Sequence, residues 1–345
     1  MYAQLREGSA WHDLQEVAKA ITNHEVDSRF ACLVTDDSHP NTLTKKGHLD
    51  YVVRKAIMEG IDPLEAIQMV TINVAQLYHL DTEMGSITPG KCADMVLIDN
   101  LNGCHIVSTF IDGELVANNG ELTVNLDSYE FPEWATKTIH LHEMRPNDFD
   151  IKCDKDTVKA HVIEVAAGKT FTYDCIEEFK VENGNVVLDK EKDIMKAFVF
   201  DRHHETDSFA YGFVKGFGIK EGALAQTVAH DAHNMLVVGT NDEDMALAAN
   251  ELKNCGGGLI AVKNGKVLGK VELSLAGLIS INDLYTTERQ LDTLERAWRE
   301  MGSTLPSPFM TMGILSLACI PNLRLTNRGL VDCNEFKFVN LFKEE

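Results

Sequence analysis

The chain has 345 residues, of which 44% are hydrophobic and 25% are charged, proportions that are ordinary for a soluble globular protein. Acidic residues outnumber basic ones by 53 to 32, which gives a formal net charge of −21. A charge of this sign repels phosphate backbones and anionic lipid headgroups, so nucleic acid and membrane surfaces are poor partner candidates. The length allows two domains, each with a sizeable core.

Eight cysteines are spread along the chain without a C-x-x-C pair, so the sequence predicts neither a disulfide framework nor a thiolate zinc site. They are expected to be small core residues in a reducing compartment. The first residues contain no apolar run of signal-peptide length, and no window approaches the roughly 18 consecutive apolar residues of a membrane span. We therefore expect a cytoplasmic protein with no membrane segment.

Strand and helix patterns alternate along residues 1–80. Ser9 and Asp62 are the expected N-caps of two of the helices. This order is typical of a parallel sheet whose strands are covered by helices. The expected elements are, in chain order, a strand at 2–5, a helix from Ser9 to Ile21, a strand at 30–34, and helices at 47–59 and 62–80.

The pattern changes near Gly85 to short alternating strands separated by glycine turns, which predicts a small β-domain over residues 81–130. The following stretch, 131–150, contains Pro132, Pro146 and many polar residues. It is predicted to be a linker.

Residues 151–345 show strand patterns interrupted by helical ones, which predicts a separate α/β domain. A helix over about 241–254 is expected to begin at a capping box formed by Thr240 and Glu243. The other defining features are the Asn-Gly hairpin turns at 183–184 and 264–265 and an amphipathic helix over 283–301.

Two adjacent carboxylates, Asp36 and Asp37, follow the apolar strand at 30–34. The carboxyl ends of parallel strands form the active-site rim of barrels and open sheets. Carboxylates at that place are candidates for metal ligation or proton transfer. Neighbouring strand residues point to opposite faces, so at most one of the pair can face the interior. The alternative is that both residues only cap the following turn.

The stretch that begins "MVTINVAQLYHL" and continues to "ADMVLID" is similar to the segment that follows the last barrel strand in the amidohydrolase superfamily. There a Met-x-Thr-x-Asn-x-Ala helix leads to Gly-x-Ile-x-Pro-Gly-x-x-Ala-Asp-x-Val. The matching residues are Met69, Thr71, Asn73, Ala75, Gly85, Ile87, Pro89, Gly90, Ala93, Asp94 and Val96.

Within that superfamily the chain resembles the bacterial adenine deaminase family. The resemblance extends over essentially the whole chain but not over the whole of a family protein. It is carried by "REGSA" at 6–10, "TDDSHP" at 35–40, and the stretches at 213–245 and 308–332.

The resemblance implies a (β/α)8 barrel with a paired divalent-metal centre, manganese or iron, that activates a water to attack C6 of adenine and release ammonia. By the family pattern Asp36 would ligate the metal and shuttle a proton, while Asp37 would support it or form the turn. The other ligands of the family come from earlier strands, beginning with a His-x-His. We therefore expect a partial barrel with its last strands only, followed by the small β-domain and a carboxy-terminal α/β domain.

Four further residues are candidates for substrate binding. Arg6 and Glu7 lie on the rim of the preceding strand and would either position substrate or pair with each other. His230 and His233 match family sequence in the carboxy-terminal domain and would either approach the substrate or form a polar cluster of their own. The isolated His-x-His at 140–142 is more simply a solvent-facing segment.

The favoured hypothesis is an adenine deaminase that works when a complementary amino-terminal fragment supplies the missing strands and ligands. Two barrel strands leave an open edge and uncovered apolar helix faces, which favours this partner or self-association as a homo-oligomer. The alternatives are a non-catalytic interaction module and another amidohydrolase that acts on a cyclic amide or aminated ring. The predicted small-molecule partner is adenine.

Overall fold

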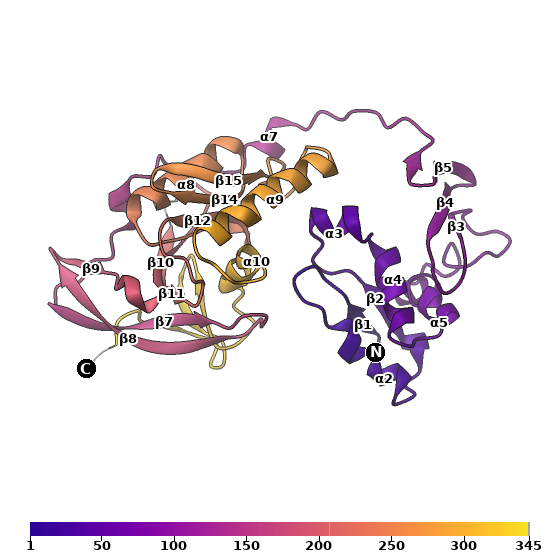
Figure 1. Cartoon of the computed structure of the whole chain (residues 1–345), viewed down its shortest axis with the longest axis horizontal. Coiled ribbons are helices and arrows are strands. Elements are labelled where there is room, and N and C mark those ends of the chain that lie inside the picture. The colour runs from indigo at the N-terminus through magenta and orange to yellow at the C-terminus, as the bar shows by residue number, and fades with distance from the viewer. Residues whose placement is uncertain (207, 344–345) are drawn as a thin grey trace. The chain divides into compact units, whose positions relative to one another are not determined.

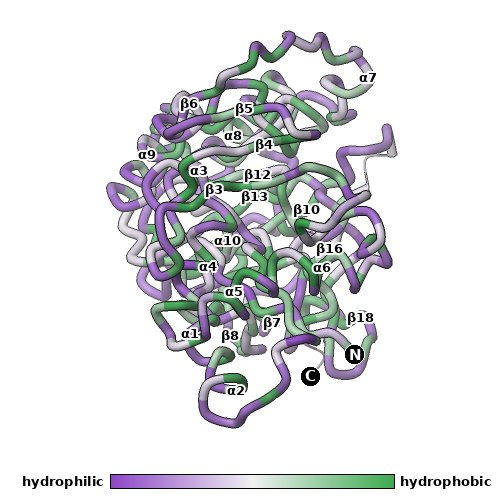
Figure 2. Tube along the Cα trace, turned by 90° about the vertical axis from the view of Figure 1, so that its right-hand side faces the viewer, coloured by the Kyte–Doolittle hydropathy of each residue, from purple (hydrophilic) through white to green (hydrophobic). Residues whose placement is uncertain are grey.

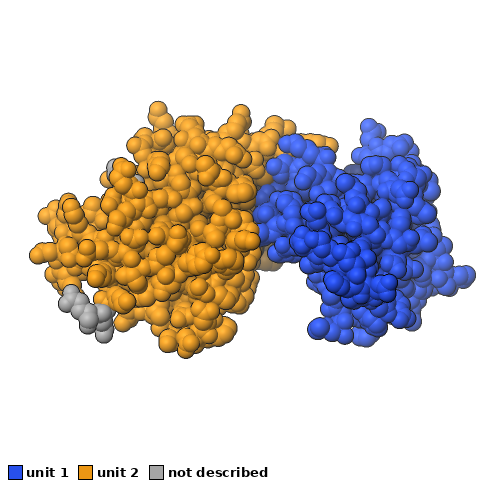
Figure 3. Space-filling view, turned by 60° about the horizontal axis from the view of Figure 1, so that its bottom comes forward, with its two compact units in different colours: residues 1–129 blue, residues 130–345 orange. Residues whose placement is uncertain are grey.

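The computed structural model describes residues 1–206 and 208–343 and divides the chain into two compact units, residues 1–129 and residues 130–345 (Figures 1 and 3). Each unit has its own sheets and its own buried apolar residues. Within the described part of the chain, no helix combines the length and the apolar character needed to cross a bilayer.

The first unit begins with two parallel strands, β1 (Ala3–Arg6) and β2 (Ala31–Val34). The register pairs Arg6 with Val34, so both strands end at the same level. Leu5 and Leu33 pack in one apolar cluster with residues of the surrounding helices. The helical elements are α1 (Leu14–Val17), α2 (Lys19–Thr22), η1 (Ser28–Phe30), α3 (Pro40–Lys45), α4 (Leu49–Met58), α5 (Pro63–Gln68) and α6 (Ile72–Leu77).

The helix predicted to start at Ser9 starts instead at Leu14, so this prediction is wrong. The Ser9 hydroxyl is used elsewhere, because it donates to Thr42 Oγ1 at 2.9 Å and accepts from the His39 backbone N–H at 2.8 Å. Residues 8–13 therefore form a loop that is tied to the segment after β2. A serine placed before an apolar stripe resembles an N-cap in sequence, but its long-range partners are not visible there.

The single helix predicted from Asp62 is two short helices, α5 and α6. Asp62 caps the first of them as expected, accepting from the Leu64 N–H at 2.9 Å. The chain then turns so that Met69 O accepts from Leu33 N at 3.1 Å. The Asn73 side chain also donates to Ala31 O at 2.8 Å. The break lets this segment satisfy polar groups along the outer edge of β2.

The short strands expected after Gly85 are present as one antiparallel sheet. Asp112 and Gly113, with φ of 50° and 80°, form the tight turn between the second and third strands. This pair has the residue types that a two-residue hairpin loop prefers. The strands are, in sheet order, β3 (Met95–Ile98), β4 (Ile106–Ile111), β5 (Glu114–Asn118) and β6 (Glu121–Leu122).

Over the described residues, the second unit contains a nine-stranded sheet in which neighbours are antiparallel except for β11 beside β7. The order is β15-β14-β12-β13-β10-β11-β7-β8-β9. The strands are β7 (Thr157–Val165), β8 (Thr172–Glu182), β9 (Asn185–Val187), β10 (Ile194–Phe200), β11 (Phe209–Lys215), β12 (Ala223–Ala229), β13 (Asn234–Gly239), β14 (Gly258–Lys263) and β15 (Lys266–Glu272).

Both faces of this sheet are covered, so its central strands β10 and β13 are buried along their whole length and are mostly hydrophobic (Figure 2). Alternate residues of β10 enter different cores: Met195 and Val199 on one face, Phe198 and Phe200 on the other. α9 (Leu284–Glu300) and α10 (Pro308–Gly313) cover the first face, and α8 (Asp242–Cys255) covers the second. The remaining elements are η3 (Lys190–Lys192), η4 (Ile314–Ser316), β16 (Leu323–Thr326), β17 (Gly329–Asp332) and β18 (Lys337–Val339).

The start of α8 differs from the predicted capping box. Asn241 is the N-cap, and its Oδ1 accepts from the Asp244 N–H at 2.8 Å. Thr240 instead uses its hydroxyl to accept from Gly222 N at 2.9 Å, which ties the strand end to its neighbour. Asparagine and threonine are both good N-caps, so the sequence alone does not separate these adjacent positions.

The stretch predicted as a linker, 131–150, packs against the second unit instead of standing free. Met144 and Phe149 are buried in the core beneath α8. The Met144 backbone also exchanges two hydrogen bonds with the Asn250 side chain, at 2.8 and 2.9 Å. The polar composition suggested a linker, but a few apolar residues are enough to anchor it. Its short helices are α7 (Glu133–Thr136) and η2 (Pro146–Phe149).

Candidate active site

Asp36 lies just beyond the end of β2, with a positive φ of 59°. Its carboxylate pairs with the Arg6 guanidinium, and its side chain is 44% exposed. Arg6 also donates to Asp13 through Nε at 2.8 Å. Burial disfavours the Arg6 charge, but the two carboxylates outweigh it and raise the pKa of Arg6. The matching ends of β1 and β2 thus bring the candidate catalytic residue together with Arg6 on one rim.

Asp37 ties the loop after β1 to the end of β2. Its Oδ2 accepts from the Ala10 N–H at 2.6 Å, and its carbonyl accepts from the Ser9 N–H at 2.9 Å. Burial raises the pKa of this carboxyl group, against the opposing effects of Ala10 and the nearby His39. Gly8 has to be glycine here, because a Cβ would lie 1.9 Å from Asp37 Oδ1. This agrees with the turn-forming role expected for Asp37.

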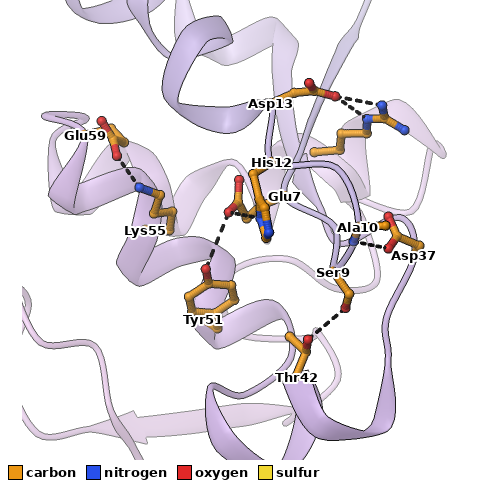
Figure 4. A network of polar contacts seen from close by, with 11 residues as sticks. Glu7, Ser9, Ala10, His12, Asp13, Asp37, Thr42, Tyr51, Lys55 and Glu59 are labelled. Atoms are coloured by element: carbon orange, nitrogen blue, oxygen red, sulfur yellow. Dashed lines mark hydrogen bonds and ion pairs between the residues drawn. The ribbon is translucent and has the colours of Figure 1, made fainter. Parts of the chain in front are cut away.

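Arg6 and Glu7 do not pair with each other, so that alternative is wrong. Adjacent strand residues point to opposite sides, and Arg6 reaches Asp36 while Glu7 turns inward. The Glu7 side chain is 2% exposed, and its Oε1 contacts His12 Nδ1 at 2.8 Å. Tyr51 donates to the same oxygen at 3.4 Å. Figure 4 shows the two rings approaching the carboxylate from the loop and from α4.

His230 and His233 lie in the second unit, in the connection between β12 and β13. Their ring centroids are 5.6 Å apart. The backbone next to them binds two further residues: Arg202 Nε donates to His233 O at 2.6 Å, and His203 Nε2 contacts Ala232 O at 2.7 Å. They thus belong to a polar cluster of the second unit, while their contact with substrate stays a prediction.

Arg202 organises that cluster as a structural residue. It is 1% exposed and donates to carbonyl oxygens of Thr138, His233 and Ala276 at 3.1, 2.6 and 2.8 Å. Burial without a carboxylate lowers the pKa of Arg202 to about 10. The Arg202 carbonyl in turn accepts from the His140 N–H, so the His-x-His at 140–142 runs beside this cluster. It is not part of a barrel strand.

The rim of β1 and β2 does not by itself complete a metal site. Across residues 1–206 and 208–343, no three His, Cys, Asp or Glu side chains are grouped closely enough to hold an ion. Asp36 contributes a single carboxylate to the rim, and this carboxylate is already paired with the Arg6 guanidinium. Tight binding of a divalent cation needs more ligands than this arrangement offers. The residues present therefore do not fit the paired metal centre on their own.

Comparisons with known proteins match both units. Residues 10–116 match the model described as "Amidohydrolase family", and residues 169–337 match the "Adenine deaminase C-terminal domain". A Clostridium botulinum (strain Langeland) protein named adenine deaminase is 57% identical over 347 residues, which cover 100% of this chain. The chain is similar to these adenine deaminases over its whole length. Adenine deaminases of Moorella thermoacetica and Staphylothermus marinus are 46% and 38% identical, over 99% and 100% of the chain.

This chain spans only 58% of the length of each of these three relatives. The rim residues Arg6, Glu7 and Asp36, all predicted from sequence, lie in the first unit. His12 and Tyr51 were not predicted. The sequence shows only that His12 follows Glu7 by five residues. A histidine at this spacing from a glutamate is too common to indicate a functional pair.

Proposed function

We propose that this chain takes part in the hydrolytic deamination of adenine to hypoxanthine and ammonia, as one portion of an adenine deaminase. The observation that carries the proposal is the similarity of the whole chain to proteins named adenine deaminase. The pairing of Asp36 with Arg6 at the ends of two parallel strands supports it, because such ends form active-site rims. Asp36 is proposed as the catalytic residue, and Arg6 as the residue that orients it.

In this proposal β1 and β2 are the last two strands of a (β/α)8 barrel. The other strands, and the further ligands of a manganese or iron centre that includes Asp36, come from polypeptide outside these 345 residues. Large apolar side chains on the helices around β1 and β2 support such a partner: Met58, Leu64 and Tyr78 are 79%, 57% and 62% exposed. A complementary segment or a second subunit would cover them.

Asp36 can reach a reacting group because its carboxylate is half exposed at the end of β2. Arg6 keeps Asp36 on the rim, and Asp13 keeps Arg6 in place. His230 and His233 are proposed as additional contacts to substrate from the second unit, in keeping with their position at a strand connection.

The test is complementation. The chain is mixed with the remaining portion of the Clostridium botulinum relative and with Mn²⁺, and ammonia release from adenine is measured. Asp36→Asn should lower the rate by about 10² to 10⁴, the usual contribution of a proton-transfer group. Asp112→Asn, at an exposed turn, is the matched control and should keep full activity.

A folded, metal-loaded mixture that releases no ammonia would count against the proposal and favour the non-catalytic alternative. Activity on another aminated ring, with none on adenine, would keep the family and change the substrate. Equal activity of the Asp36 and Asp112 variants would remove Asp36 from the reaction.

A further inference from the structure

A buried carboxylate lies directly beneath a half-exposed imidazole at the end of β1. The Glu7 side chain is 2% exposed and the His12 side chain 50%, with His12 Nδ1 at 2.8 Å from Glu7 Oε1. A carboxylate oxygen accepts, so Nδ1 carries the hydrogen of this bond. That choice leaves Nε2 as the outward nitrogen, with a lone pair available to a ligand. Within the described residues, Nε2 makes no hydrogen bond.

The loop that carries His12 is held rigidly on the same rim as Asp36. Gly8 N donates to Trp11 O at 3.0 Å, which closes the loop on itself. Ser9 and Ala10 donate their backbone N–H groups to Asp37, which directly follows Asp36. The position of His12 is therefore set by the segment that carries the candidate catalytic residue. Groups that act in catalysis need this kind of positioning.

The surroundings of Glu7 explain how its charge is tolerated. Tyr51 donates to it at 3.4 Å, and Lys55 lies on the same helix, α4. The pKa of Lys55 is raised mainly by its hydrogen bond to Glu59, with Glu7 as a further contributor. Glu7 Oε2 stays buried without a hydrogen-bond partner in the described part of the chain.

A purely structural role does not explain this arrangement well. Burying a carboxylate with incomplete hydrogen bonding is unfavourable for stability, and exposed His-carboxylate pairs contribute little. A buried carboxylate that orients a partly exposed imidazole through Nδ1 is the arrangement of catalytic dyads and of metal-bound histidines.

We propose that His12, positioned by Glu7, contacts the bound purine through Nε2 and carries one of the protons that deamination moves. This inference rests on the proposed function and adds a catalytic residue, His12, and a positioning residue, Glu7. The same site thus uses a carboxylate from the end of β2 and an imidazole from the loop after β1.

The proton balance leaves room for a second group besides Asp36. The oxygen of water becomes O6 of the product, one of its hydrogens ends on ring N1, and the other ends on the departing amino nitrogen. The C6–O bond forms and the C6–N bond breaks, and the nitrogen leaves with the electron pair as ammonia. Asp36 moves one proton. His12 takes up the other at Nε2 and returns it to the purine, so its charge is restored.

The first experiment needs no activity. The full chain is labelled with ¹⁵N-histidine and combined with the unlabelled remaining portion of the Clostridium botulinum relative, and the nitrogen chemical shifts of His12, assigned with His12→Gln, are recorded with and without adenine. The wild type should show a protonated Nδ1 and an unprotonated Nε2, and adenine should move the Nε2 signal. Glu7→Gln should shift the hydrogen toward Nε2. An Nε2 signal that adenine leaves unchanged would overturn the proposal.

The second experiment uses the complemented enzyme. His12→Gln should lower kcat by about 10² to 10⁴ with little change in KM. Glu7→Gln should lower kcat less, and His24→Gln, an exposed histidine of the same unit, should change neither. If the wild type is active and His12→Gln matches His24→Gln, the proposal fails while the deaminase assignment stands. If the wild type is inactive, the assignment fails, and the adenine-dependent shift still decides the contact with purine.

Discussion

The two units of this chain bury their apolar residues to very different extents. The second unit places a wide sheet between two helical layers, and its central strands β10 and β13 are buried at every position. The first unit has two small sheets, β1 with β2 and β3 to β6, and its helices carry exposed apolar side chains such as Met58 and Tyr78. The second unit therefore covers both faces of its main sheet, whereas the first leaves large apolar side chains exposed on its helices.

The two units also differ in the roles of their polar residues. The candidate catalytic residues Asp36 and His12 lie in the first unit, on the rim formed by β1 and β2. The guanidinium groups of Arg202 and Arg324, which are almost fully buried, lie in the second unit. The candidate site and these buried guanidinium groups therefore belong to different units of the chain.

Separate expression of the two units is expected to give the largest effect. Residues 130–345 alone should unfold in one cooperative thermal transition, because both faces of the sheet are already covered. Residues 1–129 alone should aggregate or lack a cooperative transition, because their apolar helix faces stay exposed. Circular dichroism and light scattering test both. A cooperative transition in residues 1–129 would show that this unit folds without further polypeptide.

Arg324→Met should strongly destabilise the second unit. Arg324 is fully buried and donates to carbonyl oxygens of Ile314, Ile320, Thr170 and Pro321 at 2.9, 2.8, 2.6 and 3.0 Å. Its removal leaves these acceptors unpaired, so the free energy of unfolding should fall by at least about 3 kcal/mol.

Urea denaturation of the full chain measures this loss. Arg299→Met is the matched control, because Arg299 is exposed near the end of α9 and should change stability by less than about 0.5 kcal/mol. Similar losses for both variants would mean that the Arg324 hydrogen bonds do not stabilise the unit.

Lowering the pH should decrease the free energy of unfolding of the second unit, because His233 becomes protonated. Burial lowers the pKa of His233, and His230 and Arg202 add to the effect. In the unfolded chain His233 takes up a proton near pH 6.5, whereas in the folded state it does so only at lower pH. The contribution of neutral His233 to the free energy of unfolding is therefore complete above about pH 6.5 and is lost as the pH falls through the folded-state pKa. Denaturation at pH 7.5 and 5.5 should show the loss.

His233→Asn should make that loss smaller, because asparagine does not titrate and tolerates the positive φ of 52° at this position. His79→Asn is the control, since His79 is exposed and has a similar φ of 59°. An unchanged pH dependence in His233→Asn would assign the acid sensitivity to other groups.

The smallest expected effect on stability is that of Asp36→Asn in the first unit. The side chains of Arg6 and Asp36 are 34% and 44% exposed, and ion pairs of this kind contribute up to about 1 kcal/mol. The free energy of unfolding, measured in the full chain, should change by less than that. A loss as large as that of Arg324→Met would show that Asp36 is primarily structural.

Much of the fold was predictable from local pattern. The strands at 2–5 and 30–34, the Asn-Gly turns at 183–184 and 264–265, and the helix over 283–301 all appear close to the expected positions. The two errors in helix caps share one cause. Ser9 and Thr240 are locally good caps, but each binds a distant partner in the folded chain. Propensity describes a residue and its neighbours, and long-range hydrogen bonds override it.

The candidate site was predictable only in part. Asp36 and Arg6 were expected at strand ends, and the structure brings them together. The contact between Glu7 and His12 was not expected, because both residues belong to a loop whose shape is set by Asp37 from another strand.

The sequence by itself determined the alternation that sends β10 side chains into two cores, the turn positions, and the similarity of the whole chain to adenine deaminases. These follow from residue type and spacing along the chain. Only the tertiary structure decided that Arg6 binds Asp36 and that Glu7 orients His12. Such contacts depend on strand register and on loops tied by distant residues, which no short stretch of sequence encodes.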